Sequence, residues 1–309
     1  MVTVVLCPGQ GAQKVGMGRD LAERFPAARA TFQAIDDAIG VPLSRIMWEG
    51  PEEDLTRTHN AQPAILAHTA AVFAVVGQAL GPVALGLGHS LGEYSAYVIA
   101  GALTPEAAAR LVRRRGELML EAGTRRAGTM AAVLGLGADE VAAACAEAST
   151  GGEVAVAANL NEPTQTVISG DPGAVTRAGE GCKARGAKRV IGLKVSGAFH
   201  SPLMAPAVPA LQDALAAAEF KDPSFPVIAN ASAMPVGSAA AAVTLLAEQL
   251  TAPVRWVECQ REAARLAPDA RYIELGPGTV LSGLLKKIVP GAVRVPLGSA
   301  DDVEKFLAA

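Results

Sequence analysis

One stretch, Leu85-Gly86-Leu87-Gly88-His89-Ser90-Leu91-Gly92-Glu93, constrains the fold of this chain more than any other. It begins as an apolar run with little polar alternation, which is typical of a strand buried on both faces of a sheet. Gly88 and Gly92 then bracket Ser90 in the pattern G-x-S-x-G. Glycine at both positions permits a sharp turn and a close approach of strand and helix. We therefore predict a strand, a tight turn and a helix, with Ser90 at the apex of the turn.

A serine at such an apex has two interpretations. Its hydroxyl would project out of the sheet beside the Leu91 N–H at the helix start, where a developing negative oxygen is stabilised. Alternatively, the hydroxyl only caps the following helix. The pentapeptide alone leaves both open, because short motifs also occur by chance.

Length and composition indicate an α/β protein. The chain has 309 residues, of which 50% are hydrophobic and only 4% aromatic, so its core is aliphatic. This length favours one large domain with an insert. The net charge of −3 argues against nucleic acid as a partner. We expect no signal peptide and no apolar run long enough to span a membrane. Four scattered cysteines lack C-x-x-C spacing and fit reduced thiols in the cytoplasm.

The pattern changes between about Arg126 and Ser196. Strands and helices are predicted there in the order strand–helix–strand–strand–helix–strand, over Thr129–Leu134, Asp139–Ala148, Val154–Ala158, Thr166–Ser169, Ala174–Arg185 and Lys188–Val195. This is the order of a ferredoxin-like domain. We predict a small domain over residues 126–197 and a large domain made of residues 1–125 and 198–309.

Local signals predict further elements around the elbow. Val2–Cys7 is predicted as the first strand, and a helix over 18–39 breaks at Pro26. Pro63 is expected near the first position of an apolar helix that runs to Leu80. Thr104 is expected to cap the helix that contains Arg115.

Arg115 falls within the apolar stripe of its helix, so its guanidinium is expected to face inward. An inward cation is costly unless an anion meets it. That anion could be a carboxylate of the chain or the carboxylate of a substrate. Periodicity alone favours the carboxylate of the chain.

A serine nucleophile needs a general base, and the chain offers four histidines. His59 and His68 lie in a polar loop and an apolar helix, and His89 points away from its neighbour Ser90. His200 is the best candidate, because it follows a strand and sits in a loop. No acidic residue follows it closely, so a neutral carbonyl could orient its ring.

Seven segments taken together resemble the malonyl-CoA:acyl-carrier-protein transacylase family. The similarity runs in order from Cys7 to about Ile288, over the segments Pro8–Gln13, Gly88–Glu93, the Arg115 helix, Gly128–Ala131, Gly197–His200, Pro253–Trp256 and Gly276–Gly278. The resemblance implies an α/β-hydrolase-like large domain with a parallel sheet, an inserted ferredoxin-like small domain, and an active site between them.

The resemblance also implies roles for individual residues. Ser90 would be the acylated nucleophile and His200 its base. Gln249 would hold the His200 ring through its side-chain or backbone carbonyl. The backbone N–H groups of Gln10 and Leu91 would form the oxyanion hole.

Substrate recognition is implied for a second set. Arg115 would bind the free carboxylate of a malonyl group, which reverses the preference drawn from periodicity alone. Phe199 resembles the form associated with malonyl selection in polyketide acyltransferases. Supporting roles in lining the cleft are implied for His89, Asn161 and Gln62.

The implied reaction is ping-pong transfer from malonyl-CoA to the phosphopantetheine thiol of an acyl carrier protein. The resemblance implies no metal and no redox cofactor, since CoA and phosphopantetheine are substrates. A basic rim formed by Lys286, Lys287 and Arg189 would steer an acidic carrier, although solvated surface lysines and arginines fit the same pattern. Alternatives are transfer of another acyl group between carriers, a serine thioesterase or esterase, and a binding module that kept the fold.

Overall fold

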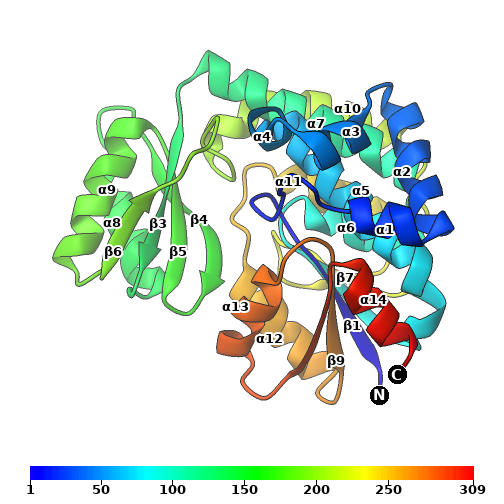
Figure 1. Ribbon diagram of the computed structural model, residues 1–309. Helices are drawn as coiled ribbons and strands as arrows, with labels where there is room; N and C mark the ends of the chain where they lie inside the picture. The colour runs from blue at the N-terminus through cyan, green and yellow to red at the C-terminus, as the bar shows by residue number, and fades with distance from the viewer.

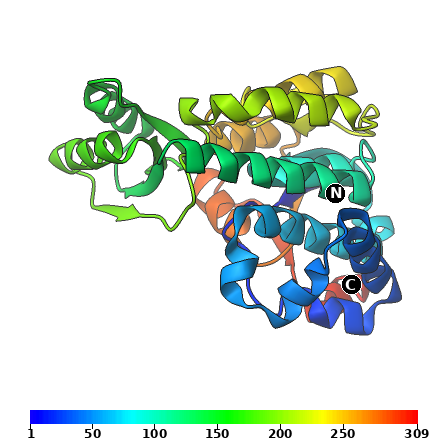
Figure 2. The same cartoon turned by 90° about the horizontal axis from the view of Figure 1, so that it is seen from above.

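Two sheets organise the computed structural model, which describes residues 1–309. The larger sheet has six strands in the order β10-β9-β1-β2-β7-β8, and the smaller has four in the order β4-β5-β3-β6. Figure 1 shows the smaller sheet with α8 and α9 at one side of the molecule. In Figure 2, the long helix α7 (Pro105–Arg125) runs toward this smaller part.

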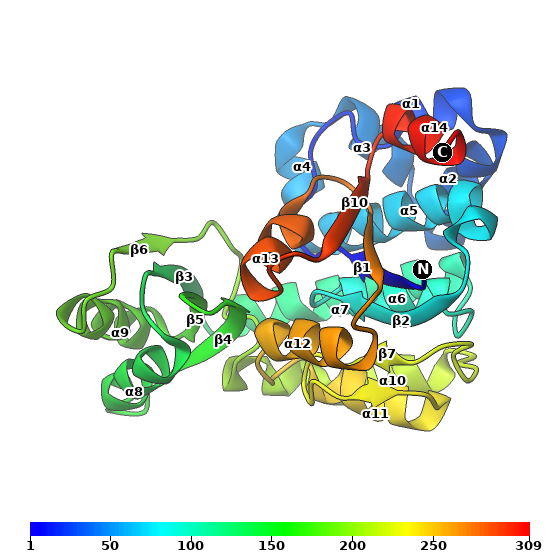
Figure 3. The ribbon, with the colours of Figure 1, turned by 90° about the horizontal axis from the view of Figure 1, so that it is seen from below.

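The larger sheet is parallel apart from its last strand. Its strands are β1 (Thr3–Cys7), β2 (Val83–Gly88), β7 (Val227–Ile228), β8 (Pro235–Val236), β9 (Arg271–Leu275) and β10 (Val293–Leu297). The short β8 pairs with β7 in the antiparallel direction. Figure 3 shows β10, β9 and β1 beside one another. Cys7 at the end of β1 lies opposite Gly88 at the end of β2, so the loops that follow these strands emerge side by side.

Helices cover both faces of this sheet. On β1, Val5 and Cys7 belong to the larger of the two cores that cover it, whereas Val4 and Leu6 belong to the core shared with α12 and α13. This burial explains why the strands have little polar alternation. Besides α7, the helices and 3₁₀ segments outside the smaller sheet's part of the protein are α1 (Arg19–Arg24), α2 (Pro26–Ile39), α3 (Leu43–Glu49), α4 (Glu52–Thr56), α5 (Thr58–Val76), η1 (Gly77–Leu80), α6 (Gly92–Ile99), η2 (Pro202–Ala207), α10 (Val208–Ala217), α11 (Ala239–Glu248), α12 (Trp256–Leu266), α13 (Val280–Ile288) and α14 (Ala300–Leu307).

The smaller sheet has the predicted ferredoxin-like topology. Its elements are β3 (Thr129–Leu134), α8 (Ala138–Ala148), β4 (Ala155–Glu162), β5 (Gln165–Gly170), α9 (Pro172–Ala184) and β6 (Arg189–Gly192). Every pairing between its strands is antiparallel. The predicted fold class is therefore confirmed. The domain boundaries at 125/126 and 197/198 remain a proposal, and they fall after α7 and between β6 and η2.

Two predictions about α5 are wrong. The helix begins at Thr58, so Pro63 lies inside it rather than near its first position. The extra turn forms because the Asn60 and Ala61 amides donate to the Arg57 carbonyl and the Asn60 side chain donates to the Asp54 carbonyl. The segment Thr58–Leu80 is also long and apolar enough to cross a membrane by length and composition. However, 67% of its most apolar window is buried inside the protein, as expected for a core helix.

His68 on α5 should make stability depend on pH. Burial lowers the pKa of this imidazole to about 4, whereas an unfolded histidine titrates near 6.5. Below pH 6.5 the unfolded chain therefore binds a proton at His68 that the folded protein does not bind. The free energy of unfolding consequently falls as the pH is lowered. We expect His68 to remove about 2 kcal/mol between pH 8 and pH 5.

Urea unfolding of wild type and His68→Gln at both pH values would measure this effect. The pH-dependent loss should be about 2 kcal/mol smaller in the variant, because other titrating groups contribute equally to both proteins. An identical pH dependence in the two proteins would contradict a neutral buried His68.

Candidate active site

Ser90 lies at the predicted tight turn between β2 and α6. Its backbone is left-handed, with a φ of 53°, which is uncommon for a residue other than glycine. The flanking glycines are sterically required. A Cβ on Gly88 would lie 1.9 Å from the Gly92 carbonyl carbon, and a Cβ on Gly92 would lie 2.1 Å from the Cys7 oxygen. The turn therefore brings the start of α6 directly over the end of β1.

His200 meets Ser90 although 110 residues separate them. The Ser90 Oγ lies 2.7 Å from the His200 Nε2, and the His200 Nδ1 lies 2.9 Å from the backbone carbonyl oxygen of Gln249. A carbonyl only accepts hydrogen bonds, so Nδ1 carries the proton and Nε2 is free to accept one from the serine. His200 is also left-handed, with a φ of 56°. The orienting group is thus a backbone carbonyl, one of the two alternatives stated for Gln249.

Two backbone amides next to Ser90 have no acceptor within the protein. These are the N–H groups of Gln10, in the turn after β1, and of Leu91, at the N-terminus of α6. The Ser90 amide itself donates to the Asn230 Oδ1 at 2.7 Å. The two amides predicted as oxyanion donors are therefore free to bind a substrate oxygen.

Arg115 is buried in the middle of α7, and its guanidinium reaches Ser90. One nitrogen, NH2, donates to the Ser90 Oγ at 3.1 Å and to the Gln249 Oε1 at 2.9 Å. The other, NH1, donates to the Gln62 Oε1 at 2.8 Å. No carboxylate lies within ion-pair distance of this guanidinium, so the carboxylate of the chain favoured by periodicity is absent. Burial lowers the pKa of Arg115, with Tyr94 and Glu93 opposing that effect.

His200 is an imidazole held neutral. Burial and the nearby positive charge of Arg115 lower its pKa to about 3. Its hydrogen bond to the Gln249 carbonyl works in the opposite direction. The ring is therefore unprotonated at neutral pH and available to accept a proton.

Sequence reasoning missed Glu93 and Asn230. Glu93 is fully buried in the first turn of α6, and its Oε2 accepts from the Asn230 amide at 2.9 Å and from the Gln249 Nε2 at 2.8 Å. Burial raises the pKa of Glu93 to about 7. The acidic residue of the elbow motif itself was the available signal for Glu93. Asn230 carried no sequence signal.

A cavity of about 360 Å³ opens above Ser90, between the two sheets. Phe199 and His200 line it, together with Met130 of β3 and Asn161 of β4. The remaining lining residues are Gln10, Gly11, Gln13, Thr56, His89, Ser90, Met119, Asn159, Val167, Leu193, Lys194 and Val195. Six of the residues predicted for catalysis and substrate binding line this cavity, namely Gln10, His89, Ser90, Asn161, Phe199 and His200. Of the others, Leu91 follows Ser90 in the chain, and Gln62, Arg115 and Gln249 each form a hydrogen bond with a residue that lines the cavity.

His89 and Gln62 hold parts of this wall. The His89 Nε2 lies 2.8 Å from the Asn161 Oδ1, which links the elbow to β4 of the small sheet. Gln62 bridges Arg115 and the sulfur of Met119, to which its Nε2 donates at 3.2 Å.

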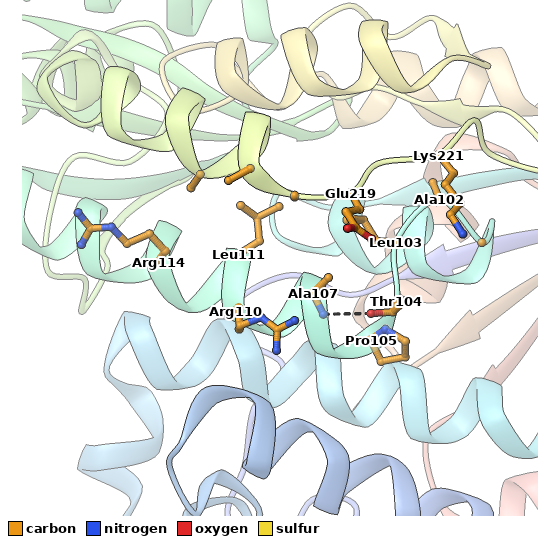
Figure 4. A pocket seen from close by; sticks show the side chains of 14 residues that line it. Ala102, Leu103, Thr104, Pro105, Ala107, Arg110, Leu111, Arg114, Glu219 and Lys221 are labelled. Atoms are coloured by element: carbon orange, nitrogen blue, oxygen red, sulfur yellow. Dashed lines mark hydrogen bonds between the residues drawn. The ribbon is translucent and has the colours of Figure 1, made fainter.

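A larger groove of about 750 Å³ lies elsewhere, between the start of α7 and the end of α10. Figure 4 shows Leu111 and Arg110 of α7 in this groove, with the Thr104 side chain capping α7 at the Ala107 amide as predicted. None of the predicted site residues lines it.

The three basic residues predicted at the rim have different surroundings. Lys287 is paired with Glu162 at 2.9 Å, which reduces the positive charge that it offers to a partner. Lys286 and Arg189 are exposed and form no ion pair.

The sequence profile of the acyl transferase domain matches residues 4–295. The chain belongs to this acyl transferase family. It is 44% identical over 283 residues to the malonyl CoA-acyl carrier protein transacylase of Bacillus subtilis, which covers 92% of this chain and 89% of that protein.

Solved structures of malonyltransferases are also similar to this acyl transferase over nearly its whole length. An acyl carrier protein S-malonyltransferase from Vibrio cholerae is 40% identical, with a TM-score of 0.94 over 99% of both chains. A malonyl-transacylase solved in complex with a type II polyketide acyl-carrier protein is 39% identical. Its TM-score is 0.95 over 100% of this chain and 99% of that one.

Proposed function

We propose that this acyl transferase moves a malonyl group from malonyl-CoA to the phosphopantetheine thiol of an acyl carrier protein, in fatty-acid or polyketide synthesis. One observation carries the proposal. The Ser90 Oγ is contacted both by a neutral imidazole and by a buried guanidinium that no carboxylate of the chain neutralises. The first suits acyl transfer through a serine ester, and the second suits an acyl group with a free carboxylate.

In the first half-reaction, the Ser90 Oγ attacks the thioester carbon of malonyl-CoA. The His200 Nε2 accepts the serine proton, and the Gln249 carbonyl stabilises the imidazolium through Nδ1. The Gln10 and Leu91 amides bind the oxyanion. The tetrahedral intermediate collapses, its bond to the CoA sulfur breaks, and His200 returns the proton to that sulfur.

Arg115 selects the acyl group. A malonyl carboxylate next to Ser90 would accept hydrogen bonds from the guanidinium, taking the place of the contact with the Ser90 Oγ. It would also offset the positive charge that lowers the pKa of His200, so the base becomes stronger once the correct substrate is bound. Phe199 lines the cavity that would hold the acyl group.

The second half-reaction runs in the opposite direction with a different thiol. The carrier thiol gives its proton to His200 and attacks the ester carbon, and the Ser90 oxygen leaves and recovers a proton from His200. This sequence consumes no electrons, so it requires no redox cofactor, and the Gln10 and Leu91 amides take the role that a metal would have at the oxyanion. We assign the protein to the cytoplasm, which is consistent with its four free, buried cysteines.

Single-turnover transfer tests the proposal. The protein is loaded with malonyl-CoA, desalted, and followed by intact mass with and without carrier bearing its phosphopantetheine. We expect loss of the malonyl ester to be at least about 100-fold faster with the carrier than in water alone. Rapid release into water would identify a thioesterase. Preferential loading of another group from a panel of acyl-CoAs would identify a transferase for that group.

A further inference from the structure

The carboxylate of Glu93 takes no part in the steps above, yet it lies directly behind them. It is completely buried, and no arginine or lysine lies within ion-pair distance. Its Oε2 binds two donors, whereas its Oε1 has no partner. A buried carboxylate without a positively charged partner destabilises the fold. The two hydrogen bonds at Oε2 must therefore offset much of the cost of burying Glu93.

The first donor is the side-chain amide of Gln249, whose two ends are chemically different. Its nitrogen end donates to the Glu93 Oε2 at 2.8 Å and to the Ser90 carbonyl oxygen at 3.0 Å. Its oxygen end accepts from Arg115 at 2.9 Å. The orientation of such an amide follows from its hydrogen-bond partners. A flipped amide would place NH₂ against the guanidinium and its oxygen against both the carboxylate and the Ser90 carbonyl oxygen, so Glu93 and the Ser90 carbonyl together exclude the flipped form.

The second donor connects Glu93 to the elbow. The backbone amide of Asn230 donates to Oε2, and the Asn230 side chain accepts from the Ser90 amide and donates to the Gly88 carbonyl, both at 2.7 Å. One carboxylate oxygen is therefore the common support of the Ser90 turn and of the amide that holds Arg115.

We propose that Glu93 is a positioning residue for acyl-group selection: it fixes the Gln249 amide, and through that amide it aims Arg115 at the substrate carboxylate. The proposal rests on the proposed function, because it assumes that Arg115 binds the malonyl carboxylate. It predicts that loss of the Glu93 acceptor lowers the preference for malonyl over acetyl, rather than only the overall rate.

Two variants separate the acceptor from the charge. Glu93→Gln keeps an acceptor oxygen in place and should retain malonyl transfer within about fivefold of wild type. Glu93→Leu removes the acceptor and leaves two buried donors unsatisfied. We expect its malonyl kcat/KM to fall about 100-fold and its malonyl-to-acetyl ratio about tenfold. If Glu93→Leu does not fold, Glu93→Asp shortens the reach by one methylene and should lower the ratio in the same direction.

A double-mutant cycle tests whether Glu93 acts through Gln249. Gln249→Leu removes the amide and keeps the backbone carbonyl on His200, so it should lower the ratio by itself. Adding Glu93→Leu should lower the ratio no further, because the amide to be oriented is already absent. If the two substitutions lower the malonyl-to-acetyl ratio by fully additive amounts, Glu93 does not act through Gln249 and the proposal is wrong.

The outcomes separate the two proposals. Wild-type protein that loads malonyl-CoA poorly and does not pass malonyl to the carrier would reject the proposed function. Wild-type protein that does transfer malonyl, with an unchanged malonyl-to-acetyl ratio in folded Glu93→Leu, would overturn the role of Glu93 alone. Acylation by p-nitrophenyl acetate, which has no carboxylate, reports on Ser90 and His200 and should fall less than tenfold in Glu93→Leu.

Discussion

Ser90→Ala should abolish the malonyl adduct and reduce transfer to the carrier by about 10⁴-fold or more. Without the Oγ there is no atom to carry the ester between CoA and the carrier, and His200 has no hydroxyl to deprotonate. Alanine is smaller and fits the space, so the loss should be chemical rather than structural. Intact mass after incubation with malonyl-CoA measures the adduct directly.

Ser95→Ala is the matched control. Ser95 lies on α6 close to Ser90 in sequence, is buried, and its hydroxyl has no hydrogen-bond partner. This variant should load malonyl as wild type does. An adduct that survives in Ser90→Ala would place the nucleophile elsewhere in the chain.

Arg115→Ala should reduce malonyl kcat/KM by about 10²–10³-fold while acetyl transfer changes less than tenfold. The guanidinium is the only cation that contacts the Ser90 Oγ, so its loss removes the partner for the substrate carboxylate. Acetyl has no such carboxylate and loses little. Steady-state transfer from both CoA esters, at matched carrier concentrations, measures the split.

Arg114→Ala is the control on the same helix. Arg114 is exposed and pairs with Glu117 and Glu121, so its removal should leave both activities within about twofold of wild type. Equal losses of malonyl and acetyl transfer in Arg115→Ala, with a lower melting temperature, would mean that Arg115 only supports the fold.

Local patterns made much of this arrangement predictable. The glycines around Ser90 predicted the turn, because their lack of Cβ atoms is what lets the start of α6 pack against β1. The periodicity of α7 correctly predicted an inward Arg115. It could not reveal what the guanidinium meets, because Gln62 and Gln249 lie 53 and 134 residues away. The family resemblance, and not the periodicity, indicated a substrate carboxylate.

Other features depend on tertiary contacts that carry no local signal. The hydrogen bonds of Glu93 span 137 and 156 residues, so nothing in the sequence around it indicated what its carboxylate binds. The edge strand β10 and helix α14 were not predicted, and β10 is only partly buried and lacks the continuous apolar run of β1. The prediction from Pro63 failed for a local reason, because hydrogen bonds of Asn60 to Arg57 and Asp54 extend α5 by a turn in front of the proline.

The left-handed backbone at Ser90 and His200 has a consequence for engineering. Glycine is the residue that accepts this conformation without strain, so Gly at either place would relax the chain by about 1 kcal/mol or more. It would also delete the reacting group. A screen for thermostable variants that measures only melting temperature would therefore select inactive proteins at these two positions. Such a screen needs an activity measurement as well.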